Sequence, residues 1–314
     1  MACDGLTDEL MNRQIRQTET RSERLRGIGL MLLAVLCMVG VDVTAKWLCA
    51  DYALSQIVFV RGAVAIVSLL SLFSATARLS ELRTQQPAIH VLRSLLSTGA
   101  IFGFFFALAH LPLAEAVTIA FAAPLIVSAL SQPLLGEKVG VRRWGAVFVG
   151  FIGVLVVLRP SANLFDPAAL AALGATTCYA FLVLTARIFS RTETAASLAL
   201  YPFMLPTLLG GLLIAGDWRS PPALDWMPFI LCGAFGALAY LTMNRALALA
   251  PPALLAPFEY VCLIGAIAAG YLVWNEVPDA TTLAGAAVIV YSGLYILHRE
   301  SRRFSPAELP STIP

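Results

Sequence analysis

Nine ionisable or polar side chains lie within, or at the edges of, segments that are otherwise apolar. They are Asp42, Lys46, Arg61, Glu115, Tyr240, Asn244, Arg245, Glu259 and Tyr260. A charged residue in a membrane-spanning segment costs about 2.5–3.5 kcal/mol on insertion scales, and such residues mark substrate or ion pathways. At that depth a carboxylate or guanidinium group can pair with an opposite charge, bind a charged solute or take part in proton transfer. We therefore treat all nine as candidates for substrate binding or coupling.

Counting about 1.5 Å of rise per residue places these candidates in two layers. Asp42, Lys46, Arg61 and Glu115 form an outer cluster of alternating sign. In this cluster Arg61 is expected to pair with Asp42 or Glu115, which avoids burying the guanidinium alone. The inner layer contains Tyr240, Asn244, Arg245 and Glu259, and the candidate Tyr260 directly follows Glu259. The two layers are interpreted as gate networks or substrate contacts, and pairing that only fixes helix register is the alternative.

The elements that must position these side chains are long apolar segments. With 59% hydrophobic and 13% charged residues, a chain of 314 residues has too little polar surface for a soluble protein. A helix needs about 20 apolar residues to cross a bilayer, and these segments have that length, unlike the alternating strands of a barrel. The expected spans are 27–48, 54–74, 88–109, 113–136, 143–158, 167–188, 196–215, 226–249, 252–274 and 281–298. We predict an all-α integral membrane protein with ten transmembrane helices.

Positive charge sets the orientation of these spans. With the N-terminus inside, sixteen Lys and Arg residues fall on inner segments, and three, Lys46, Arg159 and Arg219, fall on outer segments. The remaining two, Arg61 and Arg245, are not assigned to either side. Lys and Arg in short loops remain cytoplasmic, so this asymmetry predicts an even number of spans with both termini in the cytoplasm.

An internal repeat divides the chain into two halves. Residues 107–158 recur in degenerate form at 246–297, and an offset of 139 aligns Glu137 with Glu276. We predict a cytoplasmic, disordered tail at 1–26, five-helix repeats at 27–158 and 166–298, and a cytoplasmic tail at 299–314. Five spans per half make the second repeat insert inverted relative to the first.

Inverted repeats are the usual plan of secondary transporters, because oppositely inserted halves give two states of similar energy, one open to each side. The simpler interpretation is that duplication only enlarged a membrane bundle. We favour a transporter, with Glu259 as the best candidate for a carboxylate whose protonation is coupled to transport. Protons are thus an expected partner, beside the lipid bilayer and a small-molecule substrate.

The chain resembles the ten-span EamA-like branch of the drug/metabolite transporter superfamily over about residues 27–298. The resemblance rests on the 107–158 block and on Phe59-Val60-Arg61-Gly62, Leu135-Gly136-Glu137-Lys138, Ala256-Pro257-Phe258-Glu259-Tyr260 and Asn275-Glu276-Val277-Pro278. It implies a ten-helix bundle with a central cavity lined mainly by spans 1, 3, 4, 6, 8 and 9. Family members move small polar or amphipathic metabolites, often outward, which implies an exporter in the inner membrane. Asn275 departs from Gly136 of the first copy.

Other functions are less well supported. An uncoupled facilitator or channel is the nearest alternative, and a membrane-embedded enzyme is a remote one, because the chain has no HExxH, GxSxG or GxxxxGK[ST] motif. No catalytic residue, cofactor or metal is expected, since no His or Cys stands at ligand spacing and His90, His110 and His298 are interpreted as interfacial or solvated. The spread of the arginines gives no reason to expect nucleic-acid binding. The protein is expected to be a monomer or homodimer.

Overall fold

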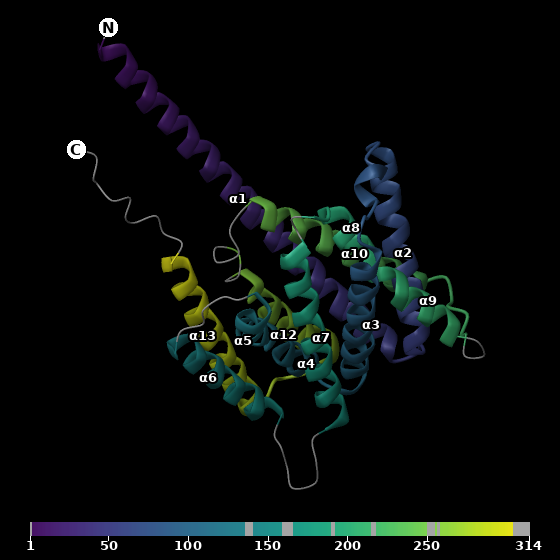
Figure 1. Cartoon of the computed structure of the whole chain (residues 1–314). Coiled ribbons are helices and arrows are strands. Elements are labelled where there is room, and N and C mark those ends of the chain that lie inside the picture. Colours follow the sequence, from purple (N-terminus) through teal and green to yellow (C-terminus); the bar gives the residue numbers. More distant parts are fainter. Residues whose placement is uncertain are drawn as a thin grey trace.

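The computed structural model describes residues 2–135, 141–158, 166–189, 192–214, 218–249, 255 and 258–303. In these ranges the chain forms helices and short connections, without strands (Figure 1). The helices are α1 (Ala2–Cys49), α2 (Leu54–Ala75), η1 (Leu79–Leu82), α3 (Pro87–His110), α4 (Leu113–Ala120), α5 (Ala123–Leu135), α6 (Val141–Leu158), α7 (Pro167–Phe189), α8 (Ala195–Leu200), η2 (Tyr201–Phe203), α9 (Met204–Leu213), α10 (Trp226–Leu249), α12 (Val261–Trp274) and α13 (Ala280–Arg303).

Six helical stretches of the described chain are long and apolar enough to cross a membrane. They are Leu25–Cys49, Leu54–Ala75, Pro87–His110, Pro167–Ala186, Ala196–Leu213 and Trp226–Ala246. Four shorter apolar stretches are Leu113–Val127, Trp144–Leu158, Val261–Trp274 and Ala280–Tyr295. All ten coincide with expected spans, and the all-helical membrane fold is confirmed. The number of ten spans stays a prediction.

The N-terminal segment is part of the first helix. Residues from Ala2 onward are helical and continue without a break into the apolar part of α1, and the cytoplasmic tail at 1–26 stays a prediction. Figure 1 shows this part of α1 projecting away from the other helices. Its many polar residues are compatible with helix, and the apolar span begins only at Leu25.

Three of the expected spans are interrupted; in the ninth, 252–274, a turn at Tyr260 directly precedes α12. The fourth, 113–136, is divided into α4 and α5, because α4 ends at Ala120 and α5 starts at Ala123. Pro124 lies in the first turn of α5, where its missing N–H leaves no helical hydrogen bond unmade. The seventh, 196–215, consists of α8, the short η2 and α9. Phe121 and Phe203 therefore lie at helix boundaries rather than in the middle of straight helices.

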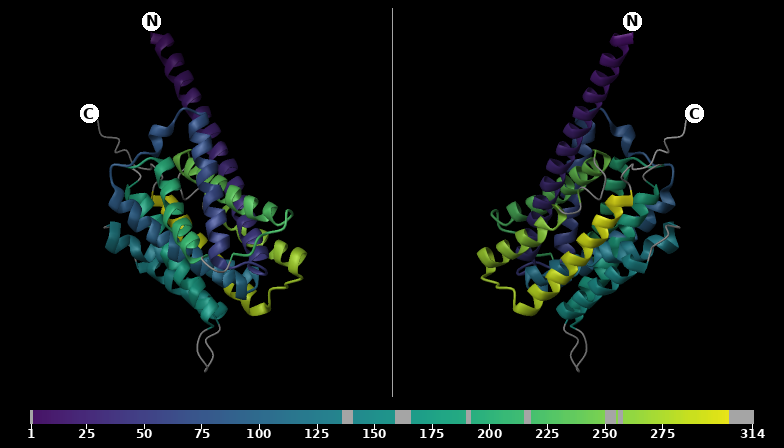
Figure 2. Two further views of the ribbon diagram at one scale, coloured as in Figure 1. Left: turned by 90° about the vertical axis from the view of Figure 1, so that its right-hand side faces the viewer. Right: turned by 90° about the vertical axis from the view of Figure 1, so that its left-hand side faces the viewer.

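Equivalent helices of the two repeats pack against each other in antiparallel pairs. Helices α6 and α13 lie side by side in Figures 1 and 2. A Cβ added to Gly153 of α6 would lie 3.0 Å from the carbonyl oxygen of Gly285 in α13, whereas one added to Gly150 would lie 2.5 Å from Ser292 Oγ. Residue numbers decrease along α6 in the direction in which they increase along α13, so the two helices are antiparallel. Only glycine permits this close approach.

The same relation holds for α2 and α9. Gly62 faces Thr207, while a Cβ on Gly210 would lie 2.8 Å from the carbonyl oxygen of Ser55. The core joins both halves as well, since its buried residues come from α1 to α7 and from α10, α12 and α13. The two repeats therefore form one packed helical body.

Candidate functional site

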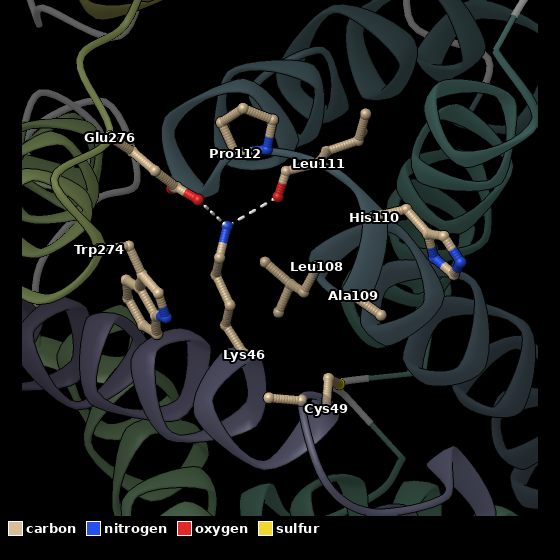
Figure 3. Close-up of a pocket in the computed structure, with 10 residues that line it drawn as sticks. Lys46, Cys49, Leu108, Ala109, His110, Leu111, Pro112, Trp274 and Glu276 are labelled. Carbon is tan, nitrogen blue, oxygen red and sulfur yellow. Dashed lines mark hydrogen bonds and ion pairs between the residues drawn. The ribbon is translucent and has the colours of Figure 1, made fainter.

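A polar junction joins the two repeats at the end of α1 (Figure 3). Lys46 Nζ donates to Glu276 Oε1 at 2.7 Å and to the carbonyl oxygen of Leu111 at 2.8 Å. The second carboxylate oxygen, Oε2, accepts from the backbone N–H of Leu113 at 2.9 Å. Leu113 is the first residue of α4, so the carboxylate also lies at the positive end of a helix dipole.

The junction borders an open pocket of about 380 Å³. The indole of Trp274 lies on one side of Lys46, with 5.3 Å between Nζ and the ring centroid. His110 lies at the other edge of the pocket and points away from Lys46 in Figure 3. The side chains of Lys46 and Glu276 are 10% and 26% exposed, so this ion pair is shielded from much of the solvent.

The outer cluster expected from the sequence is therefore only partly present. Lys46 pairs with Glu276, not with the carboxylates of the first repeat. In the sequence, Glu276 stands out only as the counterpart of Glu137 in the repeat, 230 positions from Lys46. Glu115 lies half-buried in the first turn of α4.

Asp42 and Arg61 form a second site deep in the bundle. Both are only 5% exposed. Their charges are close enough to act on each other, yet among the described residues no direct ion pair or hydrogen bond joins them. Asp42 and Arg61 are therefore near each other, but they do not form the direct pair expected from the sequence.

Two aromatic rings lie beside the Arg61 guanidinium. Its Cζ lies 5.4 Å from the ring centroid of Phe105 in α3 and 5.5 Å from that of Phe203 in η2, distances typical of cation–π interactions. Arg61 Nε is buried and has no hydrogen-bond partner in the described part of the chain. The backbone approaches at Gly236, where an added Cβ would lie 3.2 Å from Arg61 Nη2.

The structure brings most of the inner layer into the same central group. Tyr240 lies within electrostatic range of Arg61, and Tyr179 of α7 lies within range of Tyr240 and Glu259. The thiol of Cys262 is in range of both Asp42 and Glu259, and Tyr260 neighbours Glu259. The two predicted layers therefore meet. The depth estimate treated 252–274 as one straight helix, whereas α12 begins at Val261.

Two further candidates lie on α10. Asn244 is half-buried and Arg245 is exposed near the end of α10. We call the set of Asp42, Arg61, Tyr179, Tyr240, Glu259, Tyr260 and Cys262 the central polar group.

Phe121 and Tyr260 add an aromatic contact between the repeats. Their ring centroids are 5.2 Å apart with an interplanar angle of 27°, which is a stacked arrangement. Tyr260 directly precedes α12, and Phe121 directly follows α4. The tyrosine hydroxyl packs against Gly293 of α13.

A buried network that the sequence did not predict lies where α3 meets the α7–α8 connection. His90, interpreted as interfacial or solvated, is 2% exposed, and its Nε2 lies 3.1 Å from Glu193 Oε2. Glu193 also accepts from Thr84 Oγ1 at 2.9 Å and Ser197 Oγ at 3.0 Å. Burial alone would raise the pKa of the Glu193 carboxyl, but these hydrogen bonds together lower it.

Arg93 belongs to the same region. Its guanidinium donates to the Leu182 carbonyl at 2.8 Å, to Thr185 Oγ1 at 2.9 Å and to the Leu198 carbonyl at 3.2 Å. The sequence analysis counts Arg93 with the inner charges, near the start of the expected span 88–109. In the folded protein α7 and α8 cover it, and it crosslinks three helices.

Comparison with known proteins assigns the chain to a family. Residues 25–159 and 166–298 each match the EamA-like transporter family. A riboflavin transporter of Vibrio cholerae is 31% identical, over 89% of this chain and 95% of its own length. An S-adenosylmethionine uptake transporter of Rickettsia bellii is 28% identical, over 89% and 96%. A pseudopaline exporter of Pseudomonas aeruginosa is 26% identical, over 84% and 93%.

A solved structure shares the fold. It superposes with a TM-score of 0.61 at 20% identity, covering 91% of this chain and 99% of its own. The relatives carry the names of transporters and not of enzymes, which agrees with the interpretation of the sequence. Because the family match covers both repeats, this multi-pass membrane protein belongs to the EamA-like transporter family.

Proposed function

We propose that the protein is a secondary active transporter that moves a small polar or amphipathic metabolite by alternating access between two inverted five-helix repeats, 27–158 and 166–298. Both termini lie in the cytoplasm, and the membrane is the bacterial inner membrane. The observation that carries the proposal is the antiparallel packing of equivalent helices, α6 with α13 and α2 with α9, in a chain whose two halves each match a transporter family.

In this proposal the Lys46–Glu276 junction closes the outer end of the transport path. It joins α1 and the start of α4 to the end of α12, so movement of one repeat away from the other must break it. The central polar group lies between the repeats and contacts the substrate. Since an ion pair and a helix N-terminus can separate and re-form without strain, the junction suits a gate.

The relatives differ in substrate and direction. Those quoted are named for S-adenosylmethionine uptake, for riboflavin and for pseudopaline export. These names support a small metabolite as the substrate here. Export, the direction expected from the sequence, and proton coupling through Glu259 are retained as the finer parts of the proposal.

Exchange in proteoliposomes tests the transporter. Vesicles containing the purified full-length chain are loaded with a bacterial metabolite extract, and mass spectrometry identifies solutes that leave when the same extract is present outside. A carrier is expected to show counterflow, meaning faster flux when the solute is present on the opposite side. Flux insensitive to the opposite side indicates the facilitator or channel alternative, and no flux above protein-free vesicles contradicts transport.

Substitution of Glu259 by Gln tests proton coupling. The variant is expected to lose the acceleration of uphill transport by a pH gradient while retaining solute counterflow, because exchange needs no net proton movement. Wild-type protein in vesicles without a gradient is the control. An unchanged response to the gradient in a folded variant excludes Glu259 as the coupling carboxylate.

A further inference from the structure

The start of α2 is tied to the α9–α10 connection of the other repeat. The Gln56 side chain donates through Nε2 to the backbone carbonyl of Arg219 at 2.7 Å, and its Oε1 accepts from the backbone N–H of the same residue at 3.1 Å. Just before α2, Tyr52 Oη donates to Asp225 Oδ2, and the Tyr52 ring packs edge-on against Phe229 with 5.0 Å between centroids. We call these contacts the first clasp.

A second clasp ties the α2–α3 connection to the α7–α8 connection. Glu193 accepts from Thr84 Oγ1 at 2.9 Å and from the backbone N–H of Gln85 at 3.4 Å, and it contacts His90 at the start of α3. The clasps lie beyond the two ends of α2, which has 22 residues, so about 30 Å of helix separates them. Each clasp joins the first repeat to the second.

The two clasps are equivalent under the repeat. The offset of 141 that aligns the starts of α2 and α8 places Tyr52 opposite Glu193, and the offset of 139 that aligns α3 with α10 places His90 opposite Phe229. Tyr52 contacts Phe229, whereas Glu193 contacts His90. The same two positions therefore meet at both ends of the bundle, with the repeats exchanged. The side chains differ, but the connection that they make is the same.

The clasps differ from the Lys46–Glu276 junction in their exposure to water. Gln56 and His90 are 0% and 2% exposed, so separating them from their partners leaves buried polar groups without hydrogen bonds, which is costly. The junction instead borders an open pocket, from which water can replace the lost partners. Both clasps are also closed at the same time, in a structure whose junction is closed. Contacts that opened alternately with access would not be expected to coincide in this way.

We propose that both clasps stay closed throughout transport, so that the repeats separate at the Lys46–Glu276 junction and not at the ends of α2. The proposal rests on the proposed transport function and concerns how the repeats move. It assigns Tyr52, Gln56 and Glu193 as positioning residues, which hold connections of the two repeats together while the path opens elsewhere. Such residues at helix ends can fix one side of a moving bundle.

Metal bridges test the proposal, because a bridge holds its two ends together only while Ni²⁺ is bound. Among the described residues no group of three or more His, Cys, Asp or Glu side chains could hold a metal ion. Pairs of imidazoles, which bind Ni²⁺, are introduced by the double variants Tyr52→His/Asp225→His for the first clasp, Thr84→His/Glu193→His for the second and Lys46→His/Glu276→His for the junction. Each full-length variant is incubated with Ni²⁺ before reconstitution, so that the metal reaches both faces. Counterflow of solutes from the bacterial metabolite extract is then measured with Ni²⁺ and in EDTA.

Ni²⁺ should raise the unfolding temperature of all three variants but not of the wild type, which reports that each bridge has formed. In both clasp variants the flux with Ni²⁺ should stay within about twofold of the flux in EDTA, whereas Ni²⁺ should lower the flux of the junction variant at least about tenfold. The single variants Tyr52→His and Thr84→His, which retain Asp225 and Glu193 as carboxylate ligands, replace a double variant that does not fold.

Inhibition of either clasp variant by Ni²⁺, or undiminished flux in the bridged junction variant, overturns the proposal. A clasp variant without a thermal shift overturns it as well, because the two connections are then not held within bridging distance. Wild-type protein without counterflow contradicts the proposed transporter itself. Inhibition of a clasp variant that shows counterflow in EDTA removes only this inference.

Discussion

Phe121 and Tyr260 stack on each other from equivalent positions in the two repeats, with 5.2 Å between ring centroids. The offset of 139 that aligns the repeats places one on the other. A side chain that contacts its own equivalent lies near the axis relating the two halves. Each ring also adjoins a helix end, α4 for Phe121 and α12 for Tyr260. This contact is therefore sensitive to any change in how the repeats meet.

Gly293→Ala should disturb this contact from the side of α13. A Cβ at position 293 would lie 2.0 Å from Tyr260 Oη but 3.4 Å from Cζ. We expect a loss of about 1–3 kcal/mol, as for overpacked cores, seen as a lower unfolding temperature of the purified protein. Removing the hydroxyl with Tyr260→Phe in the same chain should restore much of the stability.

Gly174→Ala is the matched control for Gly293→Ala. Nothing lies within 4 Å of a Cβ at Gly174, and Ala is the better helix former, so stability should be unchanged or higher. Equal losses in the two Ala variants, or no recovery in Tyr260→Phe/Gly293→Ala, would show that the hydroxyl contact is not the cause.

The Lys46–Glu276 pair should show strong coupling in a double-mutant cycle. Lys46→Met leaves the Glu276 carboxylate with only the Leu113 N–H, and Glu276→Gln leaves the ammonium with the Leu111 carbonyl. Because the pair is largely shielded, we expect a coupling energy of about 0.5–3 kcal/mol from thermal unfolding of the four proteins. If the stability losses of the two single variants simply add, the coupling energy is near zero, as it is for many exposed surface ion pairs.

Breaking the junction should also open the pocket beside it, which the proposed orientation places on the outer side. Cys49 lines that pocket, and its thiol donates to the Phe105 carbonyl at 3.7 Å. Glu276→Gln should raise the rate at which a membrane-impermeant maleimide labels Cys49 in intact cells, with Cys49→Ser in the same background as the control. An unchanged labelling rate in Glu276→Gln argues against a gate at this position.

Asn275 stands where the first repeat has Gly136. It follows α12 with φ 56° and ψ 26°, a left-handed conformation that Gly and Asn tolerate better than other residues. Asn275→Gly should therefore leave the unfolding temperature unchanged or raise it. Asn275→Val should lower it by the equivalent of about 1–2 kcal/mol. Equal unfolding temperatures of the Gly and Val variants would mean that the backbone conformation does not determine which residue is tolerated at position 275. The counterpart Gly136 lies outside the described residues.

The scaffold was largely predictable, because the spacing of apolar residues and the repeat at 107–158 and 246–297 are local signals. The helix breaks at Phe121 and before Val261 were missed, since a break in the middle of an apolar segment changes composition very little. Depth estimates that assumed straight helices then separated Glu259 from Asp42, which the fold brings near the same thiol, Cys262.

Pairings between the repeats were harder to predict than the helices. Lys46 and Glu276 are 230 positions apart, and nothing in the sequence around either residue indicates the other as its partner. The contact between His90 and Glu193 could not be predicted for the same reason. Whether a histidine at the end of an apolar span is buried depends on which loop covers it. The Asp42–Arg61 proximity was anticipated, since depth on neighbouring spans already limited the choice of partner.

Glu193 should make the stability of the protein depend on acid pH. Its pKa is lowered in the folded state, because hydrogen bonds from His90, Thr84 and Ser197 outweigh the effect of burial. The stabilisation is therefore complete above the ordinary carboxyl pKa of 4.5 and is lost as the pH falls through the lower folded-state value. Glu193→Gln should lower the unfolding temperature by the equivalent of about 1–3 kcal/mol at pH 7, and the difference from wild type should shrink toward pH 3.

Glu81→Gln is the control, since its pair with Arg78 is 3.8 Å long with side chains 42% and 63% exposed, and it should change little at any pH. A difference between Glu193→Gln and wild type that stays constant from pH 7 to pH 3, or grows toward acid, would mean that the carboxylate is not held by these hydrogen bonds in the folded protein.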